Sequence, residues 1–118
     1  MSGAEKKTKF VNASSRTVCL AIEGGAVELP PPIKPATVSM RREIGPRVCG
    51  IRMSVDEAVG VHDLPEPEEG TICIVDYGVL PFVDESRIDV YAVDPFTPST
   101  FDLSMKRPST ASLVRIKR

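Results

Sequence analysis

An acidic loop with two prolines, which leads directly into an apolar β-branched run, most constrains how this chain folds. Residues 63–70 hold four carboxylates and two prolines, and Thr71-Ile72-Cys73-Ile74-Val75 follows at once. Proline lacks the N–H that a sheet interior needs, whereas β-branched side chains favour extended backbone. The change at Gly70 therefore predicts a strand over residues 71–75, which ends before Asp76-Tyr77-Gly78.

The remaining sequence indicates short strands rather than helices. Eleven prolines and eight glycines in 118 residues argue against long helices. The apolar fraction of 42% can fill one modest core, so we expect a single domain over residues 1–118, with residues 1–8 as a flexible tail. We predict an all-β fold, either a small β-barrel or a sandwich, with about seven short strands and little helix.

Turn residues and alternating apolar residues define the other expected elements. Gly24-Gly25 predicts a hairpin, and Gly45-Pro46 predicts a turn. Gly50 within a strand indicates a bulge or a close backbone approach. Residues 56–61 could extend that strand or start another, and residues 79–83 could form a helical turn. The expected further strands cover residues 17–22, 27–29, 36–43, 48–55, 87–93 and 111–118.

The net charge of −1 conceals a segregation of charge along the chain. Residues 1–55 carry +5, residues 56–102 carry −11 and residues 103–118 carry +5. The basic ends could fold back onto the acidic middle, or oppositely charged faces could pair between protomers. The acidic middle, and the lack of aromatic residues among the basic ones, argue against a nucleic-acid partner.

The cysteines and the single histidine give no metal site. Cys19, Cys49 and Cys73 lie in apolar contexts without a CxxC pair, so we expect buried free thiols in a reducing compartment. With His62 as the only histidine, no zinc-ligand spacing occurs. No apolar run approaches the roughly 20 residues that span a bilayer. We therefore expect a cytoplasmic protein that uses no metal, cofactor or membrane.

Several short motifs occur in an order that covers nearly the whole chain. They are Phe10-Val11-Asn12, Leu29-Pro30-Pro31, Ala36-Thr37-Val38, the run from Val59-Gly60 to Val75, Arg87-Ile88-Asp89-Val90 and Val114-Arg115. This order resembles an uncharacterised family of short proteins encoded by tailed phages, prophages and bacterial genomes. The most specific shared piece is the family's Leu-Pro-x-Pro-x-x-Gly-Thr-x-x-Ile-Val core, which starts at Leu64 here.

The resemblance implies a viral or mobile-element origin and a compact β-rich fold, and it implies no settled activity. Two positions depart from the family pattern. Ser14-Ser15-Arg16 replaces a Thr-Pro-His element, so no role of that histidine transfers. Pro81 interrupts a helix-like segment that usually follows the Ile-Val strand.

No residue pattern indicates an enzyme. His62-Asp63 could pair a base with an orienting acid, but no nucleophile motif accompanies them, and a surface histidine is the simpler interpretation. The carboxylates of residues 63–94, Glu66 among them, lack EF-hand spacing and are typical of a solvated acidic face.

Four arginines are the clearest candidate for a binding group. Arg41, Arg42, Arg47 and Arg52 flank Gly45-Pro46, and a turn there would bring their guanidinium groups together. Such a cluster could hold the phosphate groups of a small ligand or nucleotide signal. It could also contact the acidic segment of a neighbouring copy.

These features lead to two functional hypotheses. In the first, the chain is a non-enzymatic viral binding protein, a homo-oligomer that sequesters a host nucleotide-like signal or inhibits a host defence protein. Its candidate contact residues are the four arginines together with His62, Asp63 and Glu66. In the second, it is a minor virion or capsid component.

Overall fold

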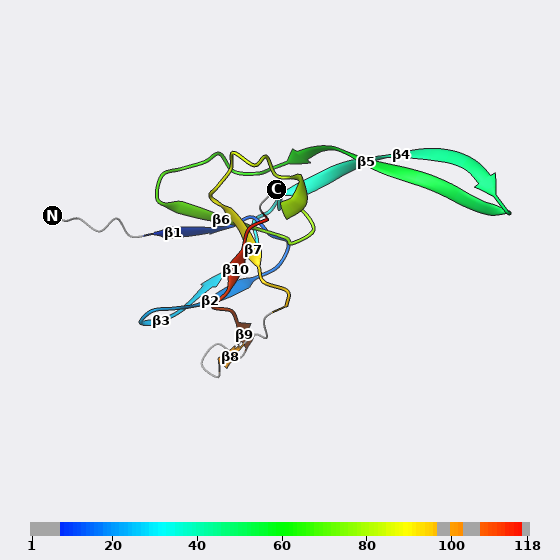
Figure 1. Cartoon of the computed structure of the whole chain (residues 1–118). Coiled ribbons are helices and arrows are strands. Elements are labelled where there is room, and N and C mark those ends of the chain that lie inside the picture. The colour runs from blue at the N-terminus through cyan, green and yellow to red at the C-terminus, as the bar shows by residue number, and fades with distance from the viewer. Residues whose placement is uncertain (1–7, 97–99, 103–106, 117–118) are drawn as a thin grey trace.

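Figure 1 shows a computed structural model of the chain, which describes residues 8–96, 100–102 and 107–116. These residues form ten strands and one short 3₁₀ helix. The elements are β1 (Lys9–Asn12), β2 (Val18–Ile22), β3 (Gly25–Leu29), β4 (Thr37–Val48), β5 (Ile51–His62), β6 (Thr71–Val75), η1 (Leu80–Phe82), β7 (Val90–Val93), β8 (Thr100–Asp102), β9 (Arg107–Ser109) and β10 (Leu113–Val114).

A four-stranded sheet with the order β1-β6-β7-β10 forms the centre of the body. β1, β6 and β7 run parallel, and β10 joins β7 antiparallel. The apolar run of β6 suits this central position, because strands buried on both faces need apolar side chains on both. Ile74 of β6 is opposite Asn12 of β1 on one side and Tyr91 of β7 on the other.

The two faces of this sheet bury different clusters. On one face, Ile74 packs with Val18 and Leu20 of the β2–β3 hairpin. On the opposite face, Cys73 and Val75 pack with a larger cluster that also contains Ala13, Ala36, Val79, Leu80, Val83, Val90 and Ala92. The body is therefore layered, with the β2–β3 hairpin on one side of the sheet and η1 with its flanking loops on the other.

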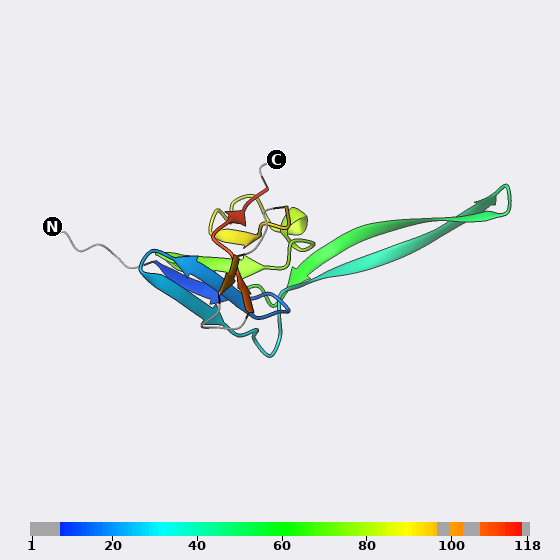
Figure 2. The same ribbon diagram turned by 90° about the horizontal axis from the view of Figure 1, so that it is seen from below.

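The β4–β5 hairpin forms a long arm that projects from this body (Figures 1 and 2). Each of its strands has twelve residues, and Val38 and Val61 anchor its root against the larger core cluster. The arm gives the molecule extents of 64 × 34 × 27 Å and a radius of gyration of 17.8 Å. A compact domain of this length would have a radius near 13 Å.

The prediction of an all-β fold is confirmed, and several elements match. The β2–β3 hairpin, the strand over residues 71–75 and the helical turn near Leu80 are all present. The central sheet stays open among the described residues, so it does not close into a barrel. The expected N-terminal tail, except for Thr8, lies outside the described residues. None of the helices that the structure describes is long and apolar enough to cross a membrane.

The predicted turn at Gly45-Pro46 is wrong, and Gly50, expected within a strand as a bulge or a close backbone approach, lies between β4 and β5 instead. Gly45 and Pro46 lie within β4, where the register with β5 shifts, and the chain reverses at Cys49-Gly50. Gly-Pro resembles a turn in sequence, but an irregularity in a strand pair also tolerates proline. Residues 56–61, left open in sequence, extend β5.

Candidate interaction surface

A two-residue turn closes the outer end of the arm. Cys49 has φ 51° and Gly50 has φ 82°, so both central residues are left-handed. Positive φ at both positions is the signature of a type I′ turn, whose twist matches that of a hairpin. The turn sets the cross-strand register, with Val48 opposite Ile51 and Arg47 opposite Arg52.

The close approach of β4 and β5 explains why residue 45 is a glycine. A Cβ atom at this position would lie 2.9 Å from the main-chain oxygen of Met53 on the opposite strand. Only glycine lets the two strands come this close without displacement. Because Gly45-Pro46 is the only segment of β4 opposite Met53, the side chain of Met53 has no direct cross-strand partner.

One face of the outer half of the arm is apolar. Side chains alternate between the faces of a strand, and direct cross-strand partners share a face. Val48, Ile51, Met53 and Val55 therefore project from the same face, and we call these four residues the apolar stripe. Their exposed fractions are 54%, 65%, 50% and 67%, so no described part of the chain covers them.

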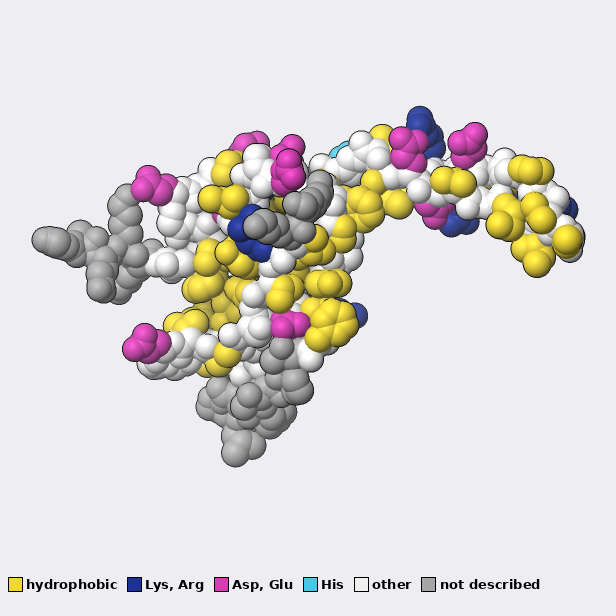
Figure 3. All heavy atoms as spheres, viewed as in Figure 1, with side chains coloured by type: hydrophobic (Ala, Val, Ile, Leu, Met, Phe, Trp, Pro, Cys, Tyr) yellow, Lys and Arg dark blue, Asp and Glu magenta, His cyan; other side chains and the backbone are white. Residues whose placement is uncertain are grey.

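The rest of the arm is also poorly covered. Met40 and Ile44 are at least half exposed on the opposite face, and Val59 is 63% exposed beside the second register shift. In Figure 3, apolar side chains gather at the outer end of the arm. Among the described residues, β4 pairs only with β5, so both outer edges of the arm keep unpaired backbone groups.

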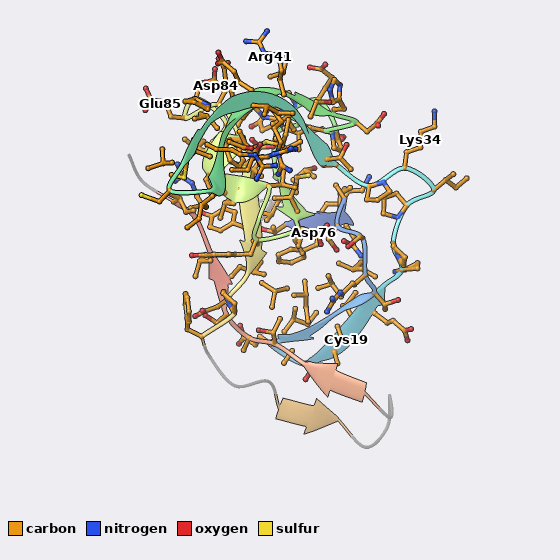
Figure 4. The ribbon with its side chains drawn as sticks, turned by 90° about the vertical axis from the view of Figure 1, so that its right-hand side faces the viewer. Cys19, Lys34, Arg41, Asp76, Asp84 and Glu85 are labelled. Carbon is orange, nitrogen blue, oxygen red and sulfur yellow. The ribbon has the colours of Figure 1, made fainter. Side chains whose placement is uncertain are left out.

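Two ion pairs cross the middle of the arm, one on each face. Arg41 Nη2 lies 2.7 Å from Glu57 Oε2, while Arg42 binds both oxygens of Asp56 at 2.7 and 3.0 Å. These hydrogen bonds lower the pKa of Asp56 below its ordinary value. Figure 3 shows charged groups on both sides of the arm, and in Figure 4 Arg41 points away from the body. Both arginines therefore already have carboxylate partners in their own chain.

The two arginines nearest the turn have no carboxylate partner among the described residues. Arg47 donates only to the main-chain oxygen of Gly50, at 3.2 Å. Arg52 lies directly opposite Arg47 and makes no hydrogen bond or ion pair with a described residue. The structure thus brings Arg47 and Arg52 together but does not gather all four arginines into one cluster.

The other predicted contact residues lie at the root of the arm. His62 ends β5 opposite Thr37, and Asp63 follows with φ 60°. Both side chains are exposed, as is that of Glu66. His62 lies ten residue steps along β5 from Arg52, a span of roughly 34 Å along the arm. His62, Asp63 and Glu66 therefore cannot share one small-ligand site with the arginines near the turn.

A largely buried ion pair holds the acidic loop against the sheet. Arg87 binds both carboxylate oxygens of Asp89 at 3.0 Å and donates to the main-chain oxygen of Pro65 at 2.8 Å. The two side chains are only 16% and 17% exposed. Hydrogen bonds from Arg87 hold the pKa of Asp89 below its ordinary value. This contact joins the Leu64–Val75 core to the Arg87-Ile88-Asp89-Val90 motif, and its role is structural.

Two of the three cysteines match the expectation of buried free thiols. Cys19 and Cys73 are buried, and burial is the main cause that raises the pKa of Cys73 to about 11. Cys49 is exposed, because it occupies the turn instead of a strand. No group of three potential metal ligands occurs within the described ranges.

A cavity of about 260 Å³ lies at the carboxyl end of β6. Arg16, Asp76 and Tyr77 contribute to its lining, and Figure 4 shows Asp76 within the body. Asp76 accepts hydrogen bonds from the backbone N–H of Ser15 at 3.2 Å and from its hydroxyl at 3.1 Å. The carboxylate thereby fixes the loop after β1, and nothing else in the cavity points to a particular ligand.

Sequence reasoning missed the apolar stripe as a surface. The alternation of Ile51, Met53 and Val55 with Arg52 and Ser54 was the available signal, and it predicts a half-buried strand. Periodicity identifies the apolar face of a strand but does not indicate whether the same chain covers it. No protein-family model, curated protein or solved structure matches this chain.

Proposed function

We propose that this chain is a non-enzymatic binding protein that acts through protein–protein contact, with the β4–β5 arm as its contact element. The observation that supports this most directly is the uncovered arm. Seven large apolar side chains between Met40 and Val59 are 50–67% exposed along one hairpin. Four of them form the apolar stripe on one face, and an exposed run of apolar side chains of this kind typically marks an interaction site.

The stability of the arm supports the same proposal. An isolated two-stranded hairpin is marginally stable in water at best, because it buries little apolar surface. Only the root of this hairpin packs on the body, through residues such as Val38 and Val61. A second protein that covers the arm would supply the missing burial.

Protein contact fits the arginines better than sequestration of a phosphate-containing signal. Arg41 and Arg42 would have to leave Glu57 and Asp56 before they could bind a phosphate group. Arg47 and Arg52 remain available, but they lie on an open arm where no described pocket encloses a ligand. A contact with a protein surface needs no enclosed pocket.

The kind of partner follows from the resemblance of the Leu64–Val75 core to phage-encoded proteins. On that basis we propose a viral protein whose partner is either a host protein, such as a defence component, or another copy of itself. A minor virion component is the second candidate. It is favoured by the length of the arm, since a projecting hairpin can join neighbouring subunits.

Site-specific photo-crosslinking in cells that produce the protein tests the contact element. A photoreactive side chain at Met53 should form an adduct with a protein that mass spectrometry can identify. The same group at Ile33, which is fully exposed but lies in the connector outside the arm, is the matched control. An equal yield at both positions, or none at Met53, would contradict the proposal. Adducts to particle proteins in purified virions would identify the virion role.

A further inference from the structure

The two outer edges of the arm differ, and the difference indicates how a partner binds it. We propose that a different protein adds an extended segment to the outer edge of β5 as a third strand. This inference rests on the proposed function, because it names the way in which a partner covers the arm.

The backbone of β5 shows which of its polar groups are free. The main-chain oxygen of Met53 faces β4, where a Cβ atom at Gly45 would lie 2.9 Å from it. Along an antiparallel strand, successive residues direct their N–H and C=O groups to opposite edges. The backbone groups of Arg52, Ser54 and Asp56 therefore face away from β4. Among the described strands, none pairs with this outer edge.

The outer edge of β5 is better suited to a third strand than the outer edge of β4. β5 has no extra residue between Ile51 and Ala58, so its outward-facing groups recur at every second residue. The extra residue at Gly45-Pro46 interrupts this spacing on β4. Such irregularities protect a strand edge from added strands. A third strand on β5 would also supply what a two-stranded ribbon lacks, since three strands with an apolar face can form a stable sheet.

The side chains of β5 define the chemistry of the added segment. Arg52 lies directly opposite Arg47, and like charges at such positions destabilise a strand pair. An acidic residue on the other side of Arg52 would offset this repulsion. On the apolar face, Met53 has no direct partner on β4, and Ile51 and Val55 flank it at alternate positions. The segment that fits β5 therefore has apolar residues at alternate positions and a carboxylate beside Arg52.

A second copy of the chain fits this edge less well. The carboxylates of β5 are those of Asp56 and Glu57, which already bind Arg42 and Arg41 of their own chain. Arg52 of another copy would have to compete with these arginines for either carboxylate. A segment of a different protein can supply a carboxylate without that competition.

Proline substitutions on the two edges test the binding mode. Ser54 and Ile44 lie directly opposite each other, so their backbone groups face the two outer edges. Proline removes an N–H there but leaves the hydrogen bonds between β4 and β5 in place. With the photoreactive group at Met53, in cells that produce the protein, S54P should lower the adduct yield about tenfold. I44P is the matched control and should change the yield less than about twofold.

Charge reversal is a second test that preserves the arm. R52E and R47E each replace the arginine pair with a pair of opposite charges, so neither should unfold the hairpin. Position 52 borders the added strand, whereas position 47 is one strand farther away. R52E should therefore lower the yield of the Met53 adduct about fivefold, and R47E less than about twofold. Circular dichroism and tryptic cleavage check that all four variants keep their fold and their arm, and if the proline variants lose the arm, the charge variants alone decide.

Two results would overturn the inference. The first is an equal adduct yield for the two variants of a pair that keep the arm, and the second is an adduct that joins two copies of this chain. In both cases Met53 still forms an adduct, so the arm remains a contact element and only the binding mode or the identity of the partner is wrong. If the unsubstituted arm forms no adduct at Met53, the proposed function fails as well.

Discussion

At the scale of single residues, the contact between Arg87 and Asp89 should matter most for the stability of the body. Replacing Arg87 with Ala leaves a carboxylate that is 17% exposed without its partner, and leaves the Pro65 carbonyl without this donor. Breaking a buried ion pair costs 3–5 kcal/mol, and partial exposure lowers this to about 2 kcal/mol here. Urea unfolding at neutral pH measures the difference. R52A removes an exposed arginine without a partner and should change stability by less than about 0.5 kcal/mol.

The pH dependence of the stability of the R87A variant shows whether the loss of the ion pair with Asp89 causes the destabilisation. The pKa of Asp89 is lowered in the folded protein, so its ionised form stabilises the fold above the ordinary carboxyl pKa near 4. This contribution is lost as the pH falls through the lowered value, where Asp89 becomes protonated in the folded protein too. The stability difference between wild type and R87A should therefore shrink below about pH 4. A difference that stays constant down to pH 2 would show that Arg87 acts through packing alone.

At the scale of elements, the arm depends on the close approach of its strands at Gly45. In a G45A variant, the new methyl group would lie 2.9 Å from a main-chain oxygen, so the strands must separate. We expect a local cost of about 1 kcal/mol, and hence roughly fivefold faster tryptic cleavage after the arginines of the arm. G60A is the matched control, because a Cβ atom there meets nothing within 4 Å. Equal cleavage rates for the two variants would refute this account of Gly45.

The elements that sequence predicted correctly are those defined by local signals. Gly24-Gly25 lies between two apolar runs and marks the β2–β3 hairpin, and Gly70 marks the start of β6. The parallel pairing of Phe10 with Ile72 joins residues far apart in sequence, and no local pattern encodes it. The turn at Cys49-Gly50 was missed because cysteine rarely adopts positive φ, while Gly45-Pro46 offered a stronger turn signal nearby. The predicted arginine cluster depended on that misplaced turn, so only Arg47 and Arg52 lie together.

At the scale of the whole molecule, some charges of the basic N-terminal segment are paired with charges of the acidic middle segment of the same chain. Arg41 and Arg42, from the basic segment, bind Glu57 and Asp56 at the start of the acidic segment. For these two arginines, the pairing follows the first of the two alternatives that the sequence left open, in which basic and acidic segments meet within one chain. Arg47, Arg52 and Glu43 stay without such partners among the described residues.

Hydrogen exchange of the arm, measured in the isolated protein and with the partner that crosslinks to Met53, tests the central claim most directly. A hairpin that only a partner protein covers should exchange its amides rapidly in the isolated chain, because it is then a marginally stable ribbon. With the partner bound, exchange over residues 37–48 and 51–62 should slow by about tenfold or more, while the amides of β6 stay unchanged as the internal reference. Arm amides that exchange at the same rate with and without the partner would contradict the account, since the arm would then need no partner to stay ordered.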